Sequence, residues 1–120
     1  MSIDLNEHQP AADETQRRGH MAALAVAEQI VTISPIVPTG VTVTCSAGAP
    51  DRPRVEAHFY HSPEGVEQLA EVLGATVTTR PHQQSDPRPF TSAELVVSGV
   101  PVLAWSLAAP VAAQDAAVAA

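Results

Sequence analysis

The middle and the end of the chain carry hydrophobic positions at every second residue, which is the period of a β-strand with one buried face. Residues 41–45 alternate Val and Cys with Thr, and a similar alternation returns at residues 55–59 after a loop containing Gly and Pro. This arrangement predicts an antiparallel hairpin. Residues 90–107 repeat the pattern around Ser98-Gly99, a dipeptide suited to a tight turn, and predict a second hairpin.

Between the hairpins the period changes to that of a helix over residues 63–73. Ser62 is a favourable N-cap, Pro63 suits the first helical position, and Gly74 suits the C-terminal stop. The apolar residues of this segment share one face: Val66, Leu69, Ala70 and Leu73. The segment is therefore predicted to be an amphipathic helix that covers the sheet.

An earlier helix is predicted over residues 14–31. Asp13 and Gln16 have the spacing of a capping box at its start, and Ser34-Pro35 ends it. A run of β-branched residues weakens its last turn. Its expected buried stripe is Met21, Leu24, Ala27 and Val31.

With a third strand around residues 75–80, the predicted order is αββαβββ, a single small α+β domain spanning residues 13–107. Its sheet is expected to be mixed and mostly antiparallel. Residues 1–12 are polar without periodicity and residues 108–120 are mostly Ala, so both are expected to be disordered tails.

Composition narrows the function classes. The formal net charge of −7 opposes binding to nucleic acid phosphates, and no apolar run approaches the roughly 20 residues of a membrane span. Cys45 is the single cysteine, so an intramolecular disulfide is excluded and the cytoplasm is the expected compartment. The bias for Arg over Lys is typical of high-GC bacterial genomes. No catalytic, cofactor or metal motif is recognisable, and we expect no enzyme activity and no cofactor.

The second hairpin is apolar on both faces. A hairpin with one face in water should instead carry polar residues on that face. One face holds Ala93, Val97 and Val102, and the other holds the candidate interaction surface: Phe90, Leu103, Trp105 and Leu107. A strand pair that is apolar on both sides must be covered on both sides. The second cover is either the N-terminal helix, or another chain as a homodimer or protein partner, or a ligand in a groove.

A second candidate site follows from the helical crossover between residues 55–59 and 75–80, because such a crossover makes the two strands parallel. Their carboxyl ends are then expected to gather the following polar side chains: His61, Arg80, His82, Asp86 and Arg88. Two imidazoles with a carboxylate can ligate zinc, and two guanidiniums at a helix N-terminus can hold a small anion. The alternative is a solvated structural loop. Cys45 and His58 have opposite strand phases, so they form no zinc or nucleophile pair.

Glu64, Glu67 and Glu71 form an acidic ridge on the outer side of the 63–73 helix, which contains no basic residue. The ridge is either a solvated face or a docking surface for a basic partner. Together these features predict a non-enzymatic protein-interaction or regulatory module that uses the surface around Trp105. The alternative is a small-anion or metal-binding domain at the His61, Arg80 and His82 end of the sheet.

Overall fold

The computed structural model describes the backbone of residues 2–110 and the side chains of residues 11–110. The elements are α1 (Ser2–Ile33), β1 (Gly40–Thr44), β2 (Arg54–His58), α2 (Pro63–Leu73), β3 (Val77–Pro81), β4 (Pro89–Val97) and β5 (Val100–Leu107). The protein is α+β, with the predicted element order. Of the predicted tail 108–120, residues 111–120 lie outside the described residues.

The five strands form one mixed sheet in the order β1-β2-β5-β4-β3. β2 and β5 pair in parallel, and the other three neighbouring pairs are antiparallel. β2 and β3 therefore run in the same direction, as the crossover predicts, but they are not neighbours. The β4–β5 hairpin lies between them, because β5 takes the pairing position beside β2.

The predicted caps of α2 and the predicted turn at Ser98-Gly99 are confirmed. The Ser62 hydroxyl accepts a hydrogen bond from the Gly65 amide at 3.3 Å, and Gly74 closes the helix in the left-handed conformation with φ 69°. Ser98 and Gly99 have φ values of 50° and 80°, the pattern of a type I′ hairpin turn. These contacts involve residues only a few positions apart, so a sequence pattern can predict them.

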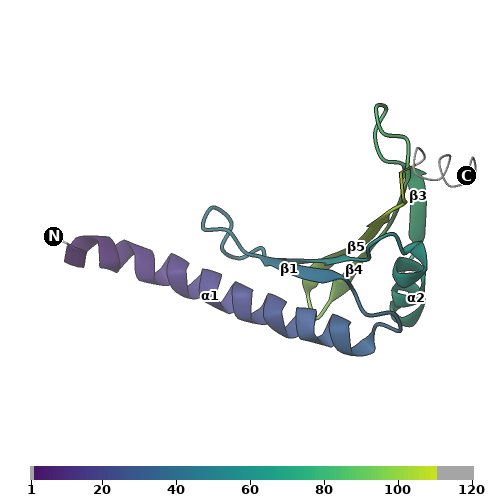
Figure 1. Cartoon of the computed structure of the whole chain (residues 1–120). Helices are drawn as coiled ribbons and strands as arrows, with labels where there is room; N and C mark the ends of the chain where they lie inside the picture. Colours follow the sequence, from purple (N-terminus) through teal and green to yellow (C-terminus); the bar gives the residue numbers. More distant parts are fainter. Residues whose placement is uncertain (1, 111–120) are drawn as a thin grey trace, which may run out of the picture.

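Both helices pack on the same face of the sheet (Figure 1). α1 covers β1 and β2 with Ala23, Val26 and Ile30, while α2 covers β4 and β5 with Val66 and Leu69. These side chains join the inward residues of the strands in one core. The N-terminal helix therefore does not cover the face that carries Trp105.

The predicted buried stripe of α1 is wrong for three of its four residues, and only Ala27 packs against the core. Met21, Leu24 and Val31 are 64%, 54% and 44% exposed, whereas Gly19, Ala23, Val26 and Ile30 face the sheet. Close approach explains the choice, because a Cβ added at Gly19 would lie 2.6 Å from the Cys45 sulfur. The side of the helix with the smaller residues packs on the sheet, and the side with larger residues is left outside.

α1 also begins at Ser2 rather than at residue 14, so residues 2–12, predicted to be a tail, are helical. The sequence there has no apolar stripe to signal a helix. However, a helix already held by packing at its C-terminal half extends readily, because each added residue gains one backbone hydrogen bond.

We expect Leu69→Ala to lower the free energy of unfolding by about 2–5 kcal/mol, because Leu69 is fully buried where α2 meets the sheet. The matched control on the same helix is Val72→Ala, whose side chain is 52% exposed and whose cost should stay within about 0.5 kcal/mol. Urea unfolding followed by circular dichroism measures both. Equal effects of the two substitutions would contradict this packing of α2.

Candidate functional site

The face of the sheet opposite the helices carries a continuous apolar row along β5. Every outward side chain of this strand is apolar: Pro101, Leu103, Trp105 and Leu107. β5 is the central strand. The outward residues of β2 on one side of the row are polar, and those of β4 on the other side are both polar and apolar: Phe90, Ser92, Glu94 and Val96. Within residues 2–110, no helix lies over this face (Figure 1). We call it the open face.

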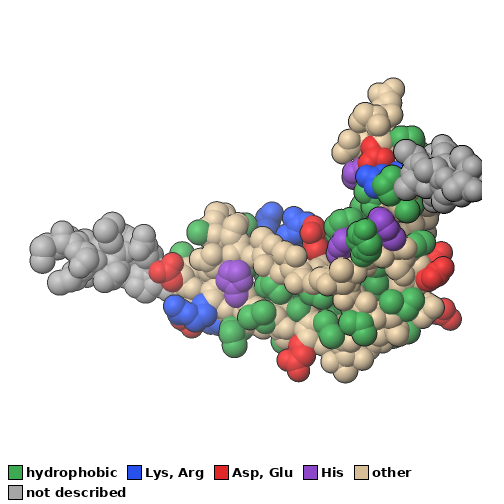
Figure 2. Space-filling model, in the orientation of Figure 1, with side chains coloured by type: hydrophobic (Ala, Val, Ile, Leu, Met, Phe, Trp, Pro, Cys, Tyr) green, Lys and Arg blue, Asp and Glu red, His purple; other side chains and the backbone are tan. Residues whose placement is uncertain are grey.

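The sheet bends between β1 and β3, and the open face lies on the inside of the bend (Figure 1). Figure 2 shows hydrophobic and histidine side chains together in this angle. The concentration of both kinds of side chain reflects a line of stacked rings across the strands.

Four rings from neighbouring parts of the sheet form this line, which we call the aromatic ladder. His58 of β2 stacks on Trp105 of β5 with centroids 4.1 Å apart and planes inclined by 19°. Phe90 of β4 stacks on the other side of Trp105 at 5.8 Å and 24°. His82, just after β3, stacks on Phe90 at 5.4 Å and 29°.

Ring geometry shows how His58 and Trp105 contact each other. Two nearly parallel rings with centroids as close as 4.1 Å must overlap face to face, because coplanar rings would collide at that distance. His58 and Trp105 therefore use their faces on one another. A nucleobase or sugar ring would have to displace a neighbour to stack inside the ladder.

The ladder continues past His58 into the turn before α2. Tyr60 meets His58 edge to face at 6.5 Å, and His61 stacks on Tyr60 at 3.9 Å. His61 has φ 48°, a left-handed conformation that a non-glycine residue seldom adopts. The buried Ser106 hydroxyl anchors this turn by accepting a hydrogen bond from the Ser62 amide at 2.9 Å. Backbone strain of this kind persists only where surrounding contacts enforce it.

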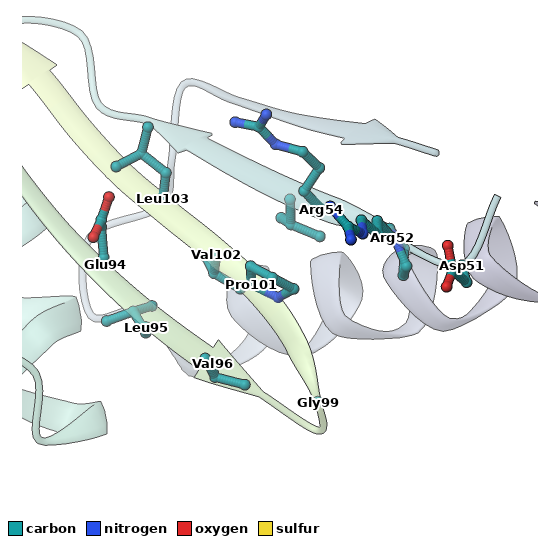
Figure 3. A pocket seen from close by; sticks show the side chains of 12 residues that line it. Asp51, Arg52, Arg54, Glu94, Leu95, Val96, Gly99, Pro101, Val102 and Leu103 are labelled. Atoms are coloured by element: carbon teal, nitrogen blue, oxygen red, sulfur yellow. The ribbon is translucent and has the colours of Figure 1, made fainter. Parts of the chain in front are cut away.

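At the other end of β5 the open face is hollowed into a shallow groove of about 720 Å³ (Figure 3). Its apolar floor includes Pro101, Leu103 and the 71% exposed Val96. Arg54 of β2 and Glu94 of β4 stand on opposite sides of the groove. The open face thus combines an apolar centre with charges of both signs at its margin.

The structure brings the predicted interaction residues together. Phe90, Leu103, Trp105 and Leu107 are all half-buried on the open face, and Phe90 and Trp105 stack directly. Sequence reasoning missed His58 and Tyr60 as members of this surface. The approach of His58 to Trp105 depends on the β2–β5 pairing, which no local pattern signals, and Tyr60 joins the surface through its contact with His58.

The predicted ligand residues are not gathered in one place. His61 follows β2 and His82 follows β3, and the three interstrand steps between these strands amount to about 14 Å. Zinc bonds to imidazole nitrogen measure about 2 Å, so the two rings cannot share one ion. No group of three or more His, Cys, Asp or Glu side chains within the described residues is placed to hold a metal.

Asp86 and Arg88 form an ion pair with each other. The Arg88 guanidinium donates two hydrogen bonds to the Asp86 carboxylate, at 2.8 and 2.6 Å. The hydrogen bond from Arg88 and then its positive charge hold the pKa of Asp86 below its ordinary value. Arg80 of β3 is paired with Phe90 of β4 in the strand register and lines a shallow polar hollow with Thr78 and Glu94.

The acidic ridge is separate from the open face. Glu64, Glu67 and Glu71 are all exposed on α2, which lies on the covered side of the sheet. In the part of the chain that the structure describes, none of the three forms an ion pair. A partner on the open face would therefore not meet this ridge.

No protein-family model matches this chain, and no curated protein matches it. Among the described residues there is no helix with the length and apolar character needed to cross a membrane.

We expect Arg88→Gln to raise the pKa of the Asp86 carboxyl toward its ordinary value, because the main cause of its lowering is removed. Arg88→Lys, which keeps the charge without the double hydrogen bond, should recover only part of the lowering. Carboxyl NMR titration measures these values. The pair stabilises the fold above the ordinary pKa of Asp, and this contribution is lost as pH falls through the lowered pKa. An unchanged titration in Arg88→Gln would contradict the assigned cause.

The left-handed backbone of His61 predicts a difference between two substitutions that both remove the ring. Asn adopts this conformation readily, whereas the β-branched Val does not, so His61→Val should be about 1–2 kcal/mol less stable than His61→Asn. Thermal or urea unfolding of the two variants gives the comparison. Equal stabilities would mean that residue 61 is free to leave the left-handed region.

Proposed function

We propose that this protein is a non-enzymatic interaction module that binds another protein chain on its open face, centred on Trp105. The observation that carries the proposal is the row along β5, whose four outward side chains are apolar while both helices pack on the opposite side. Contiguous exposed apolar surface with a polar rim is typical of protein interaction sites.

The composition of the open face supports a protein partner over other ligands. Trp105 lies at the centre of the apolar row, and large aromatic side chains at such positions contribute most to association energies. Glu56 and Glu94 flank Leu103 in the strand register, and Arg54 pairs with Glu56 at 3.5 Å. The rim therefore carries both charge signs, which suits the mixed polar surface of a protein rather than a polyanion.

Two features weigh against a ligand that stacks on rings. His58 and Trp105 already stack face to face, so single-stranded nucleic acid would find no free platform between them. The net charge of −7 further opposes a phosphate backbone. The alternative anion or metal site loses its supporting geometry, since His61 and His82 stand at different strands and Asp86 is paired with Arg88.

We place the module in the cytoplasm, because its one thiol has no partner cysteine.

A photo-cross-linking amino acid at Leu103 tests the proposal in extracts of the native cells. We expect a discrete adduct with a protein, and we expect Trp105→Ala in the same chain to remove most of it. The matched control carries the cross-linker at Gln68, an exposed residue of α2 on the covered side, and should give no such adduct. Circular dichroism must show that Trp105→Ala remains folded, and Leu107→Ser, on the same outward row of β5, serves as a second variant that keeps the Trp105 ring.

The emission of Trp105 in purified protein identifies the kind of partner. If the partner is a second copy on the open face, the emission shifts to the red on dilution, as the indole becomes exposed to water. If the partner is a different protein, the emission is independent of concentration and shifts to the blue when that protein is added. Equal adducts from positions 103 and 68, or adducts insensitive to Trp105→Ala, would rule out the open face as the binding site.

A further inference from the structure

A second unpartnered surface lies on the outer side of α1. Met21, Leu24 and Val31 are 64%, 54% and 44% exposed, although they belong to a helix whose opposite side is packed on the sheet. The far side of α1 faces away from the rest of the described chain (Figure 1). Three large apolar side chains gathered along one helix are more than scattered surface hydrophobics, and they indicate a contact surface.

These residues belong to a regular seam. Positions 14, 17, 21, 24, 28 and 31 are separated alternately by three and four residues, which is the heptad spacing that places side chains along one line of a paired helix. They are occupied by Glu14, Arg17, Met21, Leu24, Glu28 and Val31, and we call this line the α1 seam. The flanking, exposed Ala25 is small enough to permit close approach of a second helix.

The charges of the α1 seam select both the partner and its direction. In an antiparallel pair of two identical helices, Met21 meets Leu24 of the partner, and Arg17 meets Glu28 of the partner. The apolar centre is then flanked on both sides by an ion pair of opposite charges. A parallel pair in register would place Arg17 against Arg17 and Glu28 against Glu28, which is repulsive.

We propose that a second copy of this chain docks on the α1 seam, with the two α1 helices antiparallel about a two-fold axis. Such a contact is closed and self-complementary, so it stops at a dimer. Arg17 now bonds to Glu14 of its own helix at 2.9 Å and is 68% exposed, so it can also meet a carboxylate from the other copy. The contact spans less than three heptads, and the dimer should be weak and dependent on concentration.

The dimer would use the side of the molecule opposite the open face. Because α1 lies beneath the sheet, pairing through its outer side leaves both open faces free and directed away from each other. The assembly would therefore be bivalent, which strengthens binding to any partner that offers two copies of the recognised surface.

Sedimentation velocity of the full chain over a range of concentrations tests the dimer. We expect wild type to pass from monomer to dimer, and Leu24→Asp to raise the dissociation constant at least about tenfold, because it places a carboxylate in the apolar centre of the seam. The matched control is Val72→Asp, at a side chain of α2 with similar exposure, 52% against 54% for Leu24. This control should leave the dissociation constant unchanged.

A charge exchange tests the antiparallel register. Arg17→Glu and Glu28→Arg should each weaken the dimer, because each makes a like-charge contact twice by symmetry. The double variant Arg17→Glu/Glu28→Arg restores opposite charges and should recover most of the affinity, while circular dichroism checks that helix content is kept. A wild type that is monomeric at all concentrations, or a double variant no stronger than the singles, overturns the proposal.

The dimer and the open-face site can fail separately. Leu24→Asp should weaken dimerisation at least about tenfold while leaving the cross-link from Leu103 to a partner in place. Trp105→Ala should remove most of the cross-link while leaving the dissociation constant of the dimer unchanged. Self-association that is lost in Trp105→Ala but kept in Leu24→Asp would place the second copy on the open face, contradicting the α1 seam and supporting the proposed function.

Discussion

The parallel pairing of β2 with β5 joins the two halves of the sheet. Val55 meets Val102 and His58 meets Trp105 in this register, and the Phe59 amide extends the contact by donating to the Trp105 carbonyl at 2.9 Å. The β1–β2 and β4–β5 hairpins are each local structures, but only this pairing makes them one sheet. It also places β5 in the centre of the sheet, so the strand with the most apolar outward face has two strands on each side of it.

One-sided packing explains why that surface remains uncovered. Gly19 lets α1 approach Cys45, and Gly65 lies against the ring of Phe59, so both helices come close to the same side of the sheet. The small side chains of the core, many of them Ala and Val, fill the short distance that results. No helix within residues 2–110 is left to cover the open face, and its rings pack on one another instead.

The molecule therefore has two apolar surfaces on opposite sides of its core. The open face is bent inward, with a groove and an aromatic ladder, and suits a partner that projects into it. The α1 seam is a straight helical line with charges arranged for its own copy. We infer that dimerisation through one and partner binding through the other are compatible, because neither surface shares a residue with the other.

The sequence by itself determined the elements whose signals are local. The Ser62 cap, the Gly74 stop, the Ser98-Gly99 turn and the outward phase of Trp105 all follow from contacts or periods within a few residues. Tertiary structure alone decided the strand order, and with it the separation of His61 from His82 and the stacking of His58 on Trp105. It also decided which side of α1 is buried, because the helix packs by closeness of approach at Gly19 rather than by the size of its apolar residues. Such pairings join residues far apart in the chain, where neither periodicity nor spacing carries information about the neighbour.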